Sequence, residues 1–231
     1  MVLKAKFLGL VVFAIAAAGS VLTACSNSQS QVQAPSPVAT TVGSNSTMDH
    51  STMDHGKMDG MNHGMDLGPA DADYDLRFID AMIPHHEGAL VMAQEVLQKS
   101  QRPEMKKLAE EIIKAQTKEI AEMKQWRKAW YPNASATPMA WHAAMGHMME
   151  MSEDQRKSMM MSMDLGKADP QFDQRFLDAM IPHHEGAIVM ANDVLSKAKA
   201  PELKQLANNI ITSQQAEIDQ MKQWRKAWYG K

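Results

Sequence analysis

The sequence has little cysteine, few aromatic residues and almost no net charge. Cys25 is the single cysteine among 231 residues, so an intramolecular disulfide is excluded. The net charge is -3, and Lys and Arg are interspersed with Asp and Glu along the chain. This pattern disfavours the basic surface that nucleic-acid-binding proteins need. The apolar run at 7–18 is too short to cross a bilayer.

Methionine and histidine, by contrast, are abundant. The chain has 22 methionines and nine histidines, and both types concentrate in particular segments. Thioether sulfur favours the soft ions Cu(I) and Ag(I), whereas neutral imidazole binds both Cu(I) and Cu(II). The composition therefore points to a transition metal held by sulfur and imidazole donors.

The first residues are typical of an exported lipoprotein. Lys4 and Lys6 precede the apolar run, and the tetrapeptide Leu-Thr-Ala-Cys ending at Cys25 has the form of a bacterial lipobox. We therefore expect 1–24 to be a signal peptide and Cys25 to be lipidated, which would place the protein at the periplasmic face of a membrane. If Cys25 is instead an incidental residue near an ordinary cleavage site, the protein would be soluble in the periplasm.

Residues 25–70 are predicted to form a flexible tether, because they are rich in Ser, Gln, Thr and Pro and contain few large apolar groups. A core that could bury methionine is not expected there, so metal binding explains the donors better than packing. The candidate ligands of the tether are Met48, His50, Met53, His55, Met58, Met61, His63 and Met65.

An internal repeat organises the rest of the chain. The sequence of 78–93 returns at 176–191 with few changes, and that of 123–131 returns unchanged at 221–229. A proline divides each copy into two helical stretches, so that 71–131 and 171–231 each predict a helical hairpin. One hairpin cannot cover its own apolar faces. We therefore expect an all-α fold in which the two tandem hairpins form an antiparallel four-helix bundle.

The linker at 132–170 is rich in methionine and histidine as well. Thr137-Pro138 and the capping box that begins at Ser152 both predict the start of a short helix. A Met-x-x-His-x-x-Met spacing suits one helical face, which allows either metal binding or amphipathic packing over the bundle. The candidate ligands of this crossover are Met139, His142, Met145, His147 and Met148.

Each copy also places donors on the buried face of its first helix. At 100° per residue Met82, His85, His86 and Met92 share one stripe, whereas Glu87 points outward. The second helix adds Met123. The equivalent candidates in the second copy are Met180, His183, His184, Met190 and Met221.

Polar residues interrupt the apolar face of each second helix. Glu119 and Glu217 are predicted to hydrogen-bond the non-ligating nitrogen of a histidine and to orient its ring, and Gln116 and Gln214 are assigned the same supporting role. A tryptophan follows three residues after Met123 and after Met221. Trp126 and its counterpart Trp224 either lie over a bound cation or pack between helices.

The motif Asp-Ala-Met-Ile-Pro-His-His-Glu-Gly-Ala, followed by Gln-x-x-Glu-Ile-x-x-Met-x-x-Trp, resembles a bacterial domain-of-unknown-function family, the CopM-like copper-binding proteins. The resemblance covers about 73–131 and 171–229. It implies a ferritin-like helical bundle, export from the cytoplasm, and a link to copper binding and resistance. It also implies metal contacts at the Met and His positions of both copies. The lipobox is not part of the family pattern.

We expect, then, a protein that sequesters or transfers copper for homeostasis and resistance, with Cu(I) as its ion and Ag(I) as a surrogate. Copper exporters or sensors would be its protein partners. An enzyme is not expected, because di-iron bundles need Glu-x-x-His pairs facing the interior, and the motif lacks them. The alternative is a helical lipoprotein scaffold or adaptor without tight metal binding, which leaves the methionines of the tether unexplained.

Overall fold

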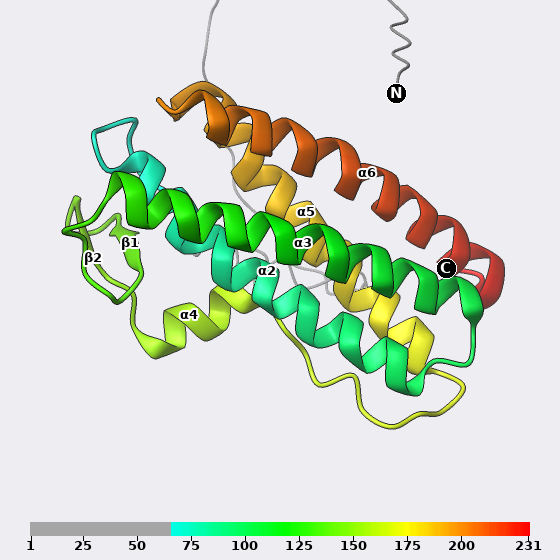
Figure 1. The fold of residues 1–231 in the computed structure, drawn as a ribbon. Coiled ribbons are helices and arrows are strands. Elements are labelled where there is room, and N and C mark those ends of the chain that lie inside the picture. The colour runs from blue at the N-terminus through cyan, green and yellow to red at the C-terminus, as the bar shows by residue number, and fades with distance from the viewer. Residues whose placement is uncertain (1–65) are drawn as a thin grey trace, which may run out of the picture. The chain divides into compact units, whose positions relative to one another are not determined.

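The structure, a computed structural model, describes residues 66–231. The predicted signal peptide, the predicted lipobox and the candidate tether donors Met48 to Met65 lie outside these residues. Within them the chain forms five helices and one two-stranded sheet (Figure 1). In chain order these are α2 (Tyr74–Lys99), α3 (Pro103–Trp130), β1 (Met139–His142), β2 (His147–Glu150), α4 (Glu153–Met160), α5 (Phe172–Lys197) and α6 (Pro201–Tyr229).

Proline starts the second helix of each copy, as predicted. Pro103 and Pro201 each begin a helix, where the missing N–H of proline costs no hydrogen bond. The short connections before them bring α3 back along α2 and α6 back along α5, and the two hairpins meet where α2 packs on α5. The expectation of a predominantly helical protein is confirmed. Across 66–231, every helix is too short or too polar to span a membrane.

The two hairpins exchange equivalent contacts, which relates them by a pseudo-twofold axis. Lys99 at the end of α2 donates to the carbonyl of Gly166, which precedes α5, at 2.9 Å. Lys197 at the end of α5 donates to the carbonyl of Gly68, which precedes α2, at 3.0 Å. Each copy therefore holds the loop that leads into the other.

The crossover differs from the prediction. Instead of a helix starting at Thr137-Pro138, residues 139–150 form an antiparallel β-hairpin in which Met139 pairs with Glu150. Tertiary contacts explain the difference, because the N–H of Met139 donates to buried Asp80 on α2 at 2.7 Å. Gly146 turns the chain with φ of +65°, a conformation that favours glycine. The all-α assignment is thus wrong for this hairpin, and so is the helical Met-x-x-His-x-x-Met face.

The second predicted start in the crossover is confirmed. Ser152 caps α4, and its side chain and that of Gln155 form a reciprocal capping box. The short helix lies across α2 (Figure 1). Gly88 permits this close approach, because a Cβ atom there would lie 1.8 Å from the carbonyl oxygen of Met160. Together α4 and the hairpin cover the outer side of α2.

Candidate metal centre

Four buried histidines meet where the two copies pack together. His85, His86, His183 and His184 are each at most 1% exposed. The rings of His85 and His183, one from α2 and one from α5, have centroids 3.9 Å apart. Each also lies beside the second histidine of its own helix, at 6.4 Å and 6.1 Å between centroids. The prediction that both histidines of each copy face inward is therefore correct.

A glutamate from the second helix of each hairpin orients one histidine. Nε2 of His86 lies 2.8 Å from Glu119, and Nε2 of His184 lies 2.7 Å from Glu217. A carboxylate accepts from an N–H, so neutral imidazoles in these pairs carry the proton on Nε2 and the lone pair on Nδ1. Both Nδ1 atoms are buried without a hydrogen-bond partner among residues 66–231. They are available as metal donors.

Burial keeps the central pair neutral. Desolvation and the neighbouring histidines lower the pKa of His85 well below its usual value. For His183 the same two effects, with burial the larger, lower the pKa to about 3. Nε2 of His183 donates to the carbonyl of Met160 at 3.1 Å, which leaves its Nδ1 with the lone pair. Neither ring nitrogen of His85 has a partner within 66–231.

Unpaired nitrogens in a buried site are costly, by about 1–3 kcal/mol for each group. Native proteins rarely retain such groups without a reason, and a bound ion is one of the few that account for them. The lowered pKa values of His85 and His183 leave these two imidazoles as uncharged Lewis bases at neutral pH, in a buried site. The arrangement fits a cation that takes nitrogen lone pairs.

The predicted bundle methionines are all fully buried, and they divide between two apolar clusters. Of these predicted methionines, each cluster contains two from one copy and one from the other. The first has Met82, Met123 and Met190, and the second has Met180, Met221 and Met92. The two sets occupy equivalent positions of the two copies. Met159 in the first cluster and Met105 in the second bring the number of buried thioether sulfurs to four in each.

The histidines are not joined by carboxylates into a metal site made of His, Cys, Asp and Glu side chains in the described residues. No group of three or more His, Cys, Asp or Glu side chains within 66–231 is arranged to hold a metal. Gln116 and Gln214 are buried, but their Oε1 atoms have no hydrogen-bond partner in this part of the chain. The structure thus does not join these two amides to the histidines.

The crossover donors are separate from the histidines. Met139, His142, His147 and Met148 lie on the two strands of the hairpin, and Met145 is exposed in its turn. His142 and His147 face each other as partners in the ladder. The structure thus places these predicted ligands on the hairpin that covers α2, apart from the centre between α2 and α5.

The tryptophans form two stacked pairs. Trp126 stacks on Trp130 with centroids 5.4 Å apart, and Trp224 stacks on Trp228 at 5.3 Å. Both pairs pack against the apolar clusters. These contacts agree with the packing interpretation of the tryptophans.

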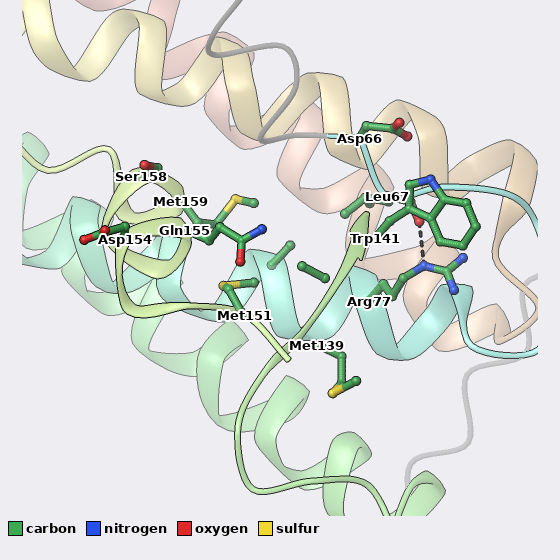
Figure 2. A pocket seen from close by; sticks show the side chains of 12 residues that line it. Asp66, Leu67, Arg77, Met139, Trp141, Met151, Asp154, Gln155, Ser158 and Met159 are labelled. Atoms are coloured by element: carbon green, nitrogen blue, oxygen red, sulfur yellow. Dashed lines mark hydrogen bonds between the residues drawn. The ribbon is translucent and has the colours of Figure 1, made fainter. Parts of the chain in front are cut away.

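Sequence reasoning did not select three methionines of the crossover, Met151, Met159 and Met160, as ligands. Met160 provides the carbonyl that binds His183. Met151 and Met159 line a cavity of about 330 Å³ between α2, the hairpin and α4, together with Met139 (Figure 2). Arg77 lies at the far side of this cavity, where its guanidinium is 5.2 Å from the ring of Trp141. The high density of methionine at 139–163 could have drawn attention to these residues. Helical periodicity alone does not separate the buried Met151 and Met159 from the exposed Met145 and Met163.

Solved structures of known proteins share this architecture. CopM in its Cu(II)-bound form is 42% identical, with a TM-score of 0.54 over 67% of this chain and 97% of that one. The apo form of CopM is 39% identical over 67% and 98% of the two chains, with a TM-score of 0.53. A DUF305 fragment from Deinococcus radiodurans is 28% identical over 67% and 95%, with a TM-score of 0.50.

Comparison of the sequence with known proteins and protein families also finds relatives. An uncharacterised protein of Acanthamoeba polyphaga mimivirus is 49% identical over 49 residues, which are 21% of this chain and only 32% of that protein. The family described as Domain of unknown function (DUF305) matches residues 18–126 and 75–225, well over half of the sequence. The family expected from the repeated motif is thus confirmed: the chain belongs to the DUF305 family.

Proposed function

We propose that this chain is an exported copper-binding protein that sequesters or transfers Cu(I). The observation that carries the proposal is the pair of buried, neutral histidines, His85 and His183, whose rings meet between the two hairpins. Three of their four ring nitrogens have no hydrogen-bond partner among residues 66–231. CopM, solved with Cu(II), Cu(I) and Ag bound, is similar to this chain over most of its described part. That likeness supports copper over other cations.

The donors suit a soft ion. The imidazole nitrogens of His85 and His183 would hold copper at the axis, and the buried thioethers of the two apolar clusters would favour its reduced state. We further propose that the four long helices form an antiparallel bundle of the ferritin-like class, with this centre in its interior. The bundle methionines, the crossover donors on the hairpin and those of 48–65 would add further sites.

Copper is cargo here rather than a catalytic cofactor. A di-iron enzyme of the bundle type needs glutamates projecting inward beside its histidines. Glu87 and Glu185, which follow the histidine pairs, instead turn outward and bind Lys124 and Lys222 on the neighbouring helix. Binding and release, without chemistry on a substrate, are therefore the proposed activity.

Metal competition tests the proposal. The purified protein is expected to take up Cu(I) or Ag(I) in preference to Zn(II) and Fe(II), because its thioether donors bind soft ions and carboxylate clusters are lacking within 66–231. Equilibration with the four ions, followed by elemental analysis of the desalted protein, measures this preference. Retention of zinc would refute a copper-selective site. Failure to retain any of the ions would favour the scaffold alternative.

We also propose that lipidated Cys25 anchors the protein at the periplasmic face of a membrane, where copper exporters or sensors would be its partners. Replacing Cys25 with Ser is expected to move the protein from the membrane to the soluble exported fraction, because one thioether-linked lipid group is lost. Fractionation of cells expressing each form measures this change. An unchanged distribution would rule out the anchor and support a soluble periplasmic protein.

A further inference from the structure

The end of α4 reaches the central histidine pair. The last residue of this helix is Met160, whose carbonyl oxygen accepts from Nε2 of His183 at 3.1 Å. The last carbonyls of a helix have no N–H partner within the helix, so they are available to side chains of other elements. Although α4 packs on α2 of the first copy, it thus contacts a candidate metal ligand of the second copy directly.

Gly88 determines how close α4 comes to α2. A Cβ atom at this position would lie 1.8 Å from the carbonyl oxygen of Met160 and 2.7 Å from its carbonyl carbon. Both are backbone atoms, so a side chain at 88 would fit only if the end of α4 moved outward. Gly88 lies within α2, where alanine has the higher helix propensity. The glycine therefore serves the contact with Met160 rather than the helix that contains it.

The backbone of Met161 shows that this end of α4 is constrained. Met161 has φ of +45°, and it is the one non-glycine residue in the left-handed region within the described part of the chain. Its N–H donates to the carbonyl of Ser158 at 3.2 Å, and the helix ends directly before it. Such conformations persist where surrounding contacts hold them, and they cluster at ligand sites. The other end of α4 is held by the capping box that begins at Ser152.

The contact with α4 decides which nitrogen of His183 can bind a metal. Because a carbonyl oxygen only accepts, Nε2 carries the proton and the lone pair is on Nδ1, which is buried without a partner among residues 66–231. A neutral imidazole that lacks such a contact can carry its proton on either nitrogen. In metal sites, a hydrogen bond from the second ring nitrogen fixes the tautomer and makes the first nitrogen a better donor.

We propose that the end of α4 is a positioning element for the metal centre, in which Gly88 lets the carbonyl of Met160 fix His183 as an Nδ1 donor. The part that concerns metal rests on the proposed function. If docked α4 strengthens metal binding at His183, the bound metal strengthens the docking of α4 by the same factor, because such coupling is reciprocal. The side chains of Arg156 and Lys157 are 51% and 65% exposed, so metal bound at the buried site changes the stability of a surface helix.

Nitrogen NMR of the metal-free protein tests the positioning. In the mature chain carrying Cys25→Ser, long-range correlation spectra at neutral pH are expected to show His183 with its proton on Nε2, the signal being identified by its loss in His183→Leu. Gly88→Ala should give a mixture of tautomers, because the carbonyl of Met160 is displaced. Lys157→Ala changes an exposed side chain of the same helix and should leave the signal unchanged. A proton on Nδ1 in the parent, or an unchanged signal in folded Gly88→Ala, would overturn the positioning.

Silver titration of the same chain tests the consequence for metal binding. Gly88→Ala is expected to weaken, by about tenfold or more, the Ag(I) site that His183→Leu removes, as loss of a group that supports a metal ligand does. Ser152→Ala loosens α4 from its other end and should weaken the same site, which keeps the test decisive if Gly88→Ala does not fold. Unchanged affinity in the folded variants would overturn the coupling. If the parent does not bind Ag(I), the proposed function fails, while the tautomer of His183 still decides whether Met160 positions it.

Proteolysis tests the reciprocal effect. Saturating Ag(I) is expected to slow trypsin cleavage after Arg156 and Lys157 by about tenfold or more, since cleavage requires α4 to undock. His183→Leu distinguishes this coupling from ions that bind the methionines of α4 directly, because it should abolish the protection. Protection that persists in His183→Leu, or cleavage of the parent at the same rate with and without Ag(I), would show that the metal does not act on α4 through this histidine.

Discussion

Replacement of both His85 and His183 by leucine is expected to abolish the tight copper site at the pseudo-twofold axis. Leucine fills a similar volume but removes the four ring nitrogens between α2 and α5. Titration of Cu(I) against a chromophoric chelator should show the affinity of this site falling by more than about 100-fold, since loss of a group that merely supports a metal ligand costs about 10- to 100-fold. Weaker sites on other segments should remain.

A matched variant controls for the loss of two imidazoles. His142→Leu with His147→Leu removes the histidine pair of the β-hairpin, which lies apart from the axis. This variant should retain the tight site. Both variants should keep the helical circular-dichroism spectrum, because the apolar stripes are unchanged. If the axis variant binds as many Cu(I) ions as the parent with the same affinities, the central histidines are structural.

Acid is expected to destabilise the metal-free protein through the same two histidines. Burial lowers the pKa of His183 to about 3 in the folded protein and lowers that of His85 in the same direction. In the unfolded chain both titrate near 6.5, so below that pH the unfolded state binds more protons than the folded state. The free energy of unfolding should therefore fall with pH, from about 6.5 toward 3, by up to about 1.4 kcal/mol per pH unit for each histidine.

Urea denaturation of the metal-free protein at several pH values measures this dependence. The variant with leucine at both positions should lose the histidine part of the slope, because its two side chains do not titrate. Above pH 6.5 it should also be more stable than the parent, since burying an unpaired polar group costs about 1–3 kcal/mol. Equal slopes for parent and variant would mean that the central histidines titrate alike in the folded and unfolded states.

The features that the sequence predicted correctly depend on interactions between residues close together in the chain, and the one it missed depends on a distant residue. Met82, His85, His86 and Met92 are buried as the helical period predicts, because a face is set by residues three or four apart. The Ser152 capping box is equally local. The hairpin at 139–150 was not predictable in this way, since it depends on Asp80, far earlier in the chain.

What the sequence by itself determined about this protein is a set of helices, their buried faces and the duplication that relates them. Only the tertiary structure decided that His85 meets His183 at the axis, that each methionine cluster combines both copies, and that Met160 serves one histidine and not the other. The physical reason is that the side chains facing across a helix–helix contact depend on how the helices cross. Local periodicity selects the face of each helix, but it does not specify the partner.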